Sequence, residues 1–133
     1  MLSVTDMTLL AMAWLLTKHA AADFLLQNEY QWRNKGFYGH PGGLLHAGIH
    51  LVLTLPVFLL LIPPSLAFAA AVVAGEYVVH YHIDWLRERT NRLNNWTAAD
   101  SAYWHVMGLD QLGHGLTYIA IVWVLLQTIR VAV

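Results

Sequence analysis

The chain has 133 residues, enough for one domain, and only 11% of them are charged while 58% are hydrophobic. Soluble domains carry about 25% charged residues, so this composition excludes an ordinary water-soluble fold. The net charge of −1 argues against a nucleic-acid partner, and the absence of cysteine excludes disulfides and thiolate metal sites.

The first apolar stretch is predicted to span a membrane over residues 7–27. Ser3 and Asp6, just before it, have the spacing of a helix-capping box. No Lys or Arg precedes the stretch, whereas Lys18 and His19 lie where a signal peptide would stay apolar. We therefore expect a transmembrane helix and not a cleaved leader.

The second predicted span covers residues 44–62, close to the ~20 residues needed to cross a bilayer. Before it, residues 28–43 form a polar connection in which glycines and Pro41 are expected to break the helix. The turn Pro63-Pro64-Ser65 follows the second span, and Ser65 is expected to cap the next helix. So short a turn makes the third span antiparallel to the second.

The third span is predicted over residues 65–86, followed by a polar loop at 87–95. Thr97 and Asp100 have capping-box spacing, which predicts a last helix from Ala98 with its membrane part at 103–130. The sequence thus predicts an all-α, polytopic membrane protein: a single four-transmembrane-helix bundle over residues 1–133.

Each predicted span carries two metal-type ligands four residues apart, which places both on one face of a helix. The pairs are His19 and Asp23, His46 and His50, His80 and Asp84, and Asp110 and His114. Because the spans alternate in direction, all four pairs fall on the same side of the bilayer. We expect one polar His/Asp pocket on that side, with four histidines (19, 50, 80 and 114) in its deeper layer.

Basic residues indicate which side this is. Arg33, Lys35, Arg87, Arg89 and Arg92 flank the connections on the pocket side. The positive-inside rule then predicts a cytoplasmic pocket with both termini outside, in a bacterial inner membrane.

A bound divalent cation would explain this clustering. Each ionisable group within a span costs roughly 2.5–3.5 kcal/mol on insertion scales, and a cation bound by His and Asp offsets that cost. Zinc is the expected metal, with iron or manganese as alternatives, in a one- or two-metal site. A hydrogen-bonded His–Asp network is the competing interpretation, and spacing alone does not separate a ligand from a residue that orients one.

Further residues are assigned to chemistry around this pocket. Glu76, Asp84 and Asp110 are the candidates for proton transfer. The candidates for binding a substrate are Gln27, Arg33, Lys35, Arg87 and Gln111. His40 and His105 lie near span ends and His82 points off the polar face, so these three are not among the predicted metal ligands. Five glycines, at positions 48, 75, 108, 113 and 115, are expected to allow close helix approach.

The ligand pairs lie within longer motifs: His19-Ala-Ala-Ala-Asp23-Phe24-Leu-Leu-Gln27, Leu45-His46 with Ile49, His80-Tyr-His-Ile83-Asp84, and Asp110-Gln111-Leu-Gly-His114. With Lys35, they resemble a family of small bacterial membrane proteins known as domain of unknown function 3307. The resemblance covers nearly the whole chain but implies no activity. In layout the sequence is also similar to His/Asp-rich membrane-bound metal-dependent hydrolases.

Three functions remain open from the sequence. The first is a metal-dependent hydrolase, in which the metal lowers the pKa of water to about 7 and the substrate is lipid-like. The second is a metal-ion or proton transporter or sensor, since His and Asp also build relays. The third is a small subunit of a membrane complex that binds haem or pigment. The bilayer is the expected surrounding, and homo-oligomerisation stays open.

Overall fold

The computed structural model describes residues 2–131, with side chains up to residue 128. Within that range every regular element is a helix and there is no strand, which confirms the all-α prediction. The elements in order are α1 (Val4–Ala21), the π-helical turn η1 (Ala22–Leu26), α2 (Glu29–Asn34), α3 (Pro41–Thr54), the 3₁₀ turn η2 (Leu55–Leu59), α4 (Leu66–Asn94) and α5 (Ser101–Val131).

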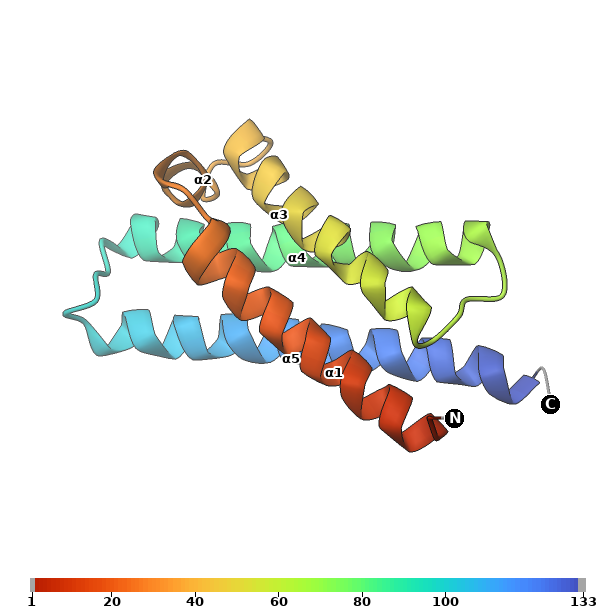
Figure 1. Ribbon diagram of the computed structural model, residues 1–133. Coiled ribbons are helices and arrows are strands. Elements are labelled where there is room, and N and C mark those ends of the chain that lie inside the picture. The colour runs from red at the N-terminus through yellow and green to blue at the C-terminus, as the bar shows by residue number, and fades with distance from the viewer. Residues whose placement is uncertain (1, 132–133) are drawn as a thin grey trace.

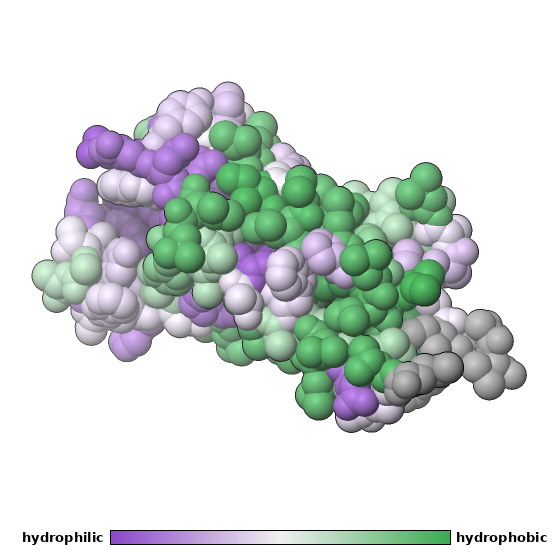
Figure 2. Space-filling model, in the orientation of Figure 1, coloured by the Kyte–Doolittle hydropathy of each residue, from purple (hydrophilic) through white to green (hydrophobic). Residues whose placement is uncertain are grey.

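Four helical segments are long and apolar enough to cross a membrane: Val4–Leu26, Pro41–Leu59, Leu66–Asn94 and Ser101–Thr128. Large apolar side chains are exposed along all of them. Figure 2 shows this apolar surface over α1 and α3, while hydrophilic surface gathers around α2 and the connection between α4 and α5. An apolar belt of this kind fits a lipid surrounding.

The four long helices form a closed bundle of two antiparallel pairs. In Figure 1, α1 lies beside α3, and this pair crosses the pair α4 and α5. Contacts link α1 to α3, α3 to α4, α4 to α5 and α5 back to α1. Both termini lie at the end opposite α2, as an even number of spans requires.

The interior divides into an apolar half and a polar half. The apolar core lies toward the termini and consists of Ala11, Leu15, Val57, Leu61, Tyr118, Ile121, Val122 and Leu125. The polar half lies toward α2, where buried His, Asp and Lys side chains replace the aliphatic ones. The bundle is thus closed by apolar packing on one side and filled by ionisable groups on the other.

Local signals set two helix starts as expected. Ser3 and Asp6 form the predicted capping box at the start of α1. The Ser65 hydroxyl accepts a hydrogen bond from the Phe68 amide at the start of α4.

Two predicted loops are wrong. Pro41, with glycines 42 and 43, was expected to break the helix; instead Pro41 occupies the first turn of α3, where a missing N–H costs nothing. The preceding connection contains the short helix α2, which Asn28 caps. The predicted loop at 87–95 is helical as far as Asn94. The α4 helix ends there because the next residue, Asn95, has a left-handed backbone (φ 55°).

The last helix starts three residues later than predicted. Thr97 and Asp100 do interact, since the Thr97 amide donates to the Asp100 carboxylate at 2.8 Å. This contact closes a turn ahead of the helix, and α5 begins at Ser101.

Most of the predicted glycine contacts are also wrong. A Cβ at glycines 48, 75, 108 or 115 would meet nothing within 4 Å, and among the five only Gly113 faces a neighbour, Ile83, at 3.2 Å. The tight approaches lie at Gly42 and Gly43 instead. A Cβ at Gly42 would come within 2.8 Å of the Tyr30 carbonyl oxygen, so α2 packs directly on the start of α3.

Candidate metal centre

The structure brings the side chains of all eight predicted ligands into one cluster, hereafter the His/Asp cluster. All of them have side chains at most 8% exposed. Within it, three groups of ligand atoms each lie within 4.8 Å of one another: Asp23, His46, His50 and His80; His19, His80 and His114; Asp84, Asp110 and His114. The four ligand pairs, which the sequence predicted to lie on the same side of the bilayer, therefore do converge.

The four histidines expected in a deeper layer pack ring against ring. The ring centroids of His50 and His80 are 3.8 Å apart, and those of His80 and His114 are 4.2 Å apart. His19 lies 4.6 Å from His114 and 5.2 Å from His50. Protonated imidazoles this close repel one another, so the four rings do not all carry a charge together, and each neutral ring has a lone pair to offer.

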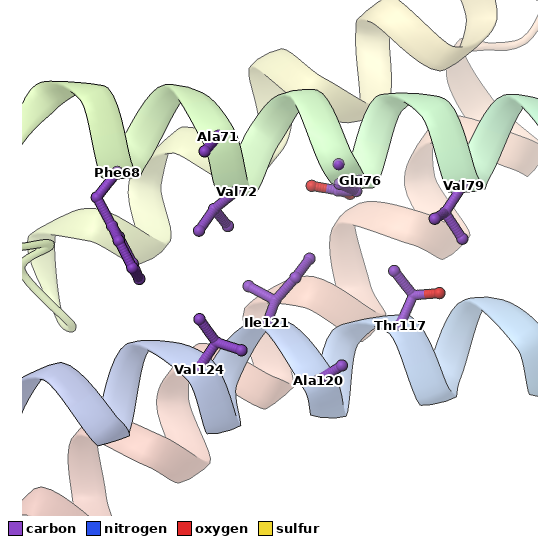
Figure 3. Close-up of a pocket in the computed structure, with 10 residues that line it drawn as sticks. Phe68, Ala71, Val72, Glu76, Val79, Thr117, Ala120, Ile121 and Val124 are labelled. Atoms are coloured by element: carbon purple, nitrogen blue, oxygen red, sulfur yellow. The ribbon is translucent and has the colours of Figure 1, made fainter.

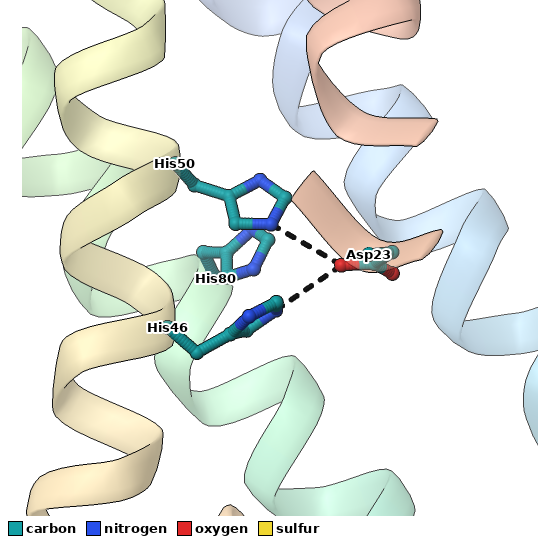
Figure 4. Close-up of side chains that lie close together, drawn as sticks. All are labelled: Asp23, His46, His50 and His80. Carbon is teal, nitrogen blue, oxygen red and sulfur yellow. Dashed lines mark hydrogen bonds and ion pairs between the residues drawn. The ribbon is translucent and has the colours of Figure 1, made fainter. Parts of the chain in front are cut away.

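Asp23 joins α1 to the histidines of α3. It lies in the π-helical turn η1, an irregularity that often marks functional sites. Its Oδ1 is 3.1 Å from His46 Nε2 and 3.2 Å from His50 Nε2, and Figure 4 shows His80 on α4 facing the same space. Ligands ~2.1 Å from a tetrahedral zinc are ~3.4 Å apart, close to these separations.

Several imidazole nitrogens in the cluster are buried without a hydrogen bond from any described residue. Both ring nitrogens of His80 and both of His46 are in this state, as is Nε2 of His19. His46 Nε2 lies 3.1 Å from the carboxylates of Asp23 and Asp84, but the angles are not those of a hydrogen bond. A network built only for hydrogen bonding would not leave these nitrogens without hydrogen bonds, whereas a metal ion accepts their lone pairs.

Buried Lys and Arg side chains contact four acidic groups in the polar half: Glu76, Asp84, Glu88 and Asp110. Lys18 Nζ lies 2.5 Å from Glu76, and Lys35 Nζ lies 3.2 Å from Asp84. The Arg87 guanidinium lies 3.3 Å from Asp110 and 2.8 Å from Glu88.

Asp23 differs from these acids. Among the described residues, its carboxylate has histidine nitrogens and no Lys or Arg nitrogen within 4 Å. The group around Asp23 is therefore the one with an uncompensated negative charge, which a divalent cation would balance.

The predicted proton-transfer residues occupy different positions relative to the cluster. Asp84 is central, because it lies within 3.5 Å of His46, His80 and His114. Asp110 is at the edge, 3.7 Å from His114. Glu76 lies one turn deeper and faces Lys18.

The predicted substrate residues do not form one site. Lys35 is buried against Asp84, and Gln111 donates to the Asp110 carboxylate at 2.9 Å. Arg33 is on the surface in an ion pair with Glu29. Only Gln27 and Arg87 line a common cavity.

That cavity, of about 220 Å³, leads from the α2 end of the bundle to Asp23. It is lined by Asp23, Phe24, Gln27, Trp32, Arg87, Glu88, Tyr103 and Met107. A polar and aromatic lining of this kind suits the headgroup zone of a membrane.

Two contacts escaped the sequence interpretation. The Tyr118 hydroxyl lies 2.8 Å from His19 Nδ1; Tyr118 follows His114 by four residues, so the same spacing rule could have found it. Lys18 also lies 3.2 Å from the His50 carbonyl oxygen, which its position in the first span did not reveal.

The three excluded histidines do lie outside the cluster. His40 accepts a hydrogen bond from the Gly42 amide at the start of α3. His82 is exposed and lies 3.2 Å from the Tyr38 hydroxyl, and His105 is exposed on α5.

Comparisons with known proteins agree with the sequence motifs. Neither the curated proteins nor the solved structures include a significant match. A family model described as "Protein of unknown function (DUF3307)" matches residues 11–133, a range that contains the whole His/Asp cluster. The chain therefore belongs to the DUF3307 family.

Proposed function

We propose that this protein is an integral membrane metal-binding protein that acts as a metal-dependent hydrolase on a lipid-like substrate. The observation that carries the metal proposal is the set of buried imidazole nitrogens of His46 and His80, beside Asp23, that make no hydrogen bond to the described residues. Asp23, His46, His50 and His80 supply three nitrogens and one oxygen, a donor set that suits zinc and also accepts iron or manganese.

Hydrolysis is favoured because the polar half ends against the apolar core and a proton acceptor, Asp84, lies beside the cluster histidines. When bound, a divalent metal supplies Lewis-acid activation of water at neutral pH. Asp84 lies against three cluster histidines and is the residue we assign to hold the proton. Lys35 keeps that carboxylate oriented through its 3.2 Å contact. Asp110 and Glu76 are more remote and take secondary positions.

A lipid-like substrate is favoured by the cavity at Asp23. Its aromatic walls, Trp32 and Tyr103, suit the interface, and Arg87 with Gln27 offers donors to an anionic or ester group. We place the cavity on the cytoplasmic side, because the exposed Arg33, Arg89 and Arg92 lie at this end of the bundle. Both termini are then outside.

Transport is the second candidate, and the apolar core weighs against it. Leu15, Val57, Leu61 and Leu125 are fully buried in the half toward the termini, so a polar path ends at the cluster. A haem or pigment site would use one or two histidines and would not account for the three aspartates beside them, whose side chains are at most 8% exposed.

The hydrolase proposal is tested by turnover of the purified, metal-loaded protein on a panel of chromogenic phosphate and acyl esters. Asp84→Asn is expected to lower turnover at least 100-fold while metal content stays within twofold, since it removes a proton acceptor and leaves the Asp23 ligand group. Asp100→Asn, in the turn before α5, is the control and should keep full turnover. Turnover that survives Asp84→Asn would overturn the catalytic assignment without touching the metal site.

A further inference from the structure

A groove outside the His/Asp cluster runs between α4 and α5 on the surface that faces the bilayer. It has a volume of about 350 Å³, within the range of small-molecule sites. Its walls are apolar except for Glu76 and Thr117 at one end, and Figure 3 shows these two residues with the apolar walls extending from them toward Phe68 and Val124. Ala71, Gly75 and Ala120 keep the groove open because their side chains are small.

The dimensions of the groove suit one alkyl chain. Along α4 it extends from Phe68 to Val79, which is ~16 Å at 1.5 Å per residue, or about half the ~30 Å hydrocarbon thickness. Ala71, Gly75 and Ala120 are exposed, so the groove opens sideways into the region of lipid tails. A chain can enter from the membrane without crossing the headgroups.

The polar end of the groove has an unused hydrogen-bond acceptor. The Glu76 side chain is 1% exposed, and its Oε1 is held by Lys18. Its Oε2 is buried and accepts no hydrogen bond from the described residues. An unpaired carboxylate oxygen in such a place costs free energy, and a donor on a ligand would recover it.

The charge at this end selects the ligand's polar group. With Lys18 on Oε1, the carboxylate is an anion, so it accepts hydrogen bonds and repels another carboxylate. The Thr117 hydroxyl donates to the Gly113 carbonyl at 2.9 Å, which leaves its oxygen able only to accept. Glu76 Oε2 and the Thr117 hydroxyl oxygen are therefore both hydrogen-bond acceptors, and a ligand group that donates, such as a hydroxyl, would pair with them.

We propose that the α4–α5 groove binds a single-chain amphiphile whose hydroxyl donates to Glu76 Oε2 and whose alkyl chain lies between Phe68 and Val124. The metal chemistry of the cluster is not needed for this binding. The site is thus independent of the proposed hydrolase activity, and a metal-free protein should retain it.

Photolabelling in nanodiscs tests the proposal, with a tetradecanol probe that carries a diazirine near the chain end and an alkyne for detection. Labels mapped by peptide mass spectrometry should concentrate on α4 near Phe68 and on α5 near Val124. Unlabelled tetradecanol should compete, whereas tetradecane and myristate should not, because the first lacks a donor and the second carries a repelled carboxylate.

Gly75→Leu provides the decisive variant, because Gly75 lines the groove and a Cβ there would meet nothing within 4 Å. It should reduce labelling about tenfold, which corresponds to about 1.4 kcal/mol of lost binding. Gly108→Leu, also in open space but outside the groove, should label like the wild type. Metal content should be unchanged in both.

Three results would overturn the proposal: labels spread evenly over all lipid-facing helices, labelling unaffected by Gly75→Leu, or a cross-link joining two copies of the chain through α4 and α5. The last would assign the groove to a dimer contact. None of them bears on the metal content of the cluster, so this failure is distinguishable from failure of the proposed function.

Discussion

Asp23 is the residue on which the metal assignment depends most. The other acidic groups of the polar half each have a Lys or Arg partner, while the Asp23 carboxylate contacts imidazoles alone. Its charge is therefore the one that a metal would neutralise. This distinction comes from the partners of each carboxylate, which the spacing of the ligand pairs does not reveal.

Asp23→Asn should lower metal affinity by at least tenfold, because it removes the charged donor but keeps the shape of the side chain. The measurement is a competition titration of the detergent-purified protein with a fluorescent zinc chelator. Asp84→Asn is the matched comparison, and we expect a smaller loss because Lys35 already balances that carboxylate. Equal losses in the two variants would contradict the assignment of the uncompensated charge to Asp23.

The buried Lys35 side chain is expected to be structural. Lys35→Met leaves Asp84 buried without its cation, and removal of one partner of a buried ion pair costs roughly 3–5 kcal/mol. Thermal unfolding in detergent should show a large loss of stability. The double variant Lys35→Met, Asp84→Asn should recover most of it, and no recovery would mean that the loss comes from Lys35 packing alone.

At the scale of elements, the sequence predicted the four spans and the convergence of their ligand pairs, because both follow from helical spacing and alternating direction. It did not predict α2, η1 or the burial of Lys35. The α2 helix packs against the start of α3, and Lys35 is buried against Asp84 of α4; contacts between separate elements such as these leave no periodic signal. The polar stretch 87–95 stayed helical because polarity alone does not break a helix: Arg87 and Asn91 are buried on the bundle side, while Arg89 and Arg92 are exposed.

The contact between α2 and α3 gives a direct test at this scale. Gly42→Ala should destabilise the protein, because the new Cβ would come within 2.8 Å of the Tyr30 carbonyl oxygen and the backbone would have to move. Gly48→Ala, in the same helix with open space around it, should be neutral or stabilising by up to about 1 kcal/mol. Thermal unfolding of the two variants measures this, and similar effects would contradict the close approach of α2.

For the whole molecule, the orientation in the membrane is a prediction of the basic residues alone. The chain has no cysteine, so single cysteines can report it without background. Ala98→Cys lies in the α4–α5 connection, and Pro64→Cys lies in the turn before α4. In intact bacterial cells an impermeant maleimide should label position 64, and it should label position 98 only after permeabilisation. The reverse pattern would place the cavity at Asp23 outside the cell.

The bundle as a whole separates an apolar, sealed half from a half that concentrates eight metal-type ligands, and metal binding is the claim on which the proposed chemistry rests. Elemental mass spectrometry of the detergent-purified protein tests it most directly. The test compares the wild type with His50→Ala, His114→Ala and with the control His82→Ala, His105→Ala, which removes two histidines outside the cluster. We predict one or two equivalents of zinc, iron or manganese in the wild type and the control, and loss of the metal in the cluster variant. No metal in the wild type, even after reconstitution with each ion, would contradict the account and leave the His/Asp cluster as a hydrogen-bonded or proton-relaying core.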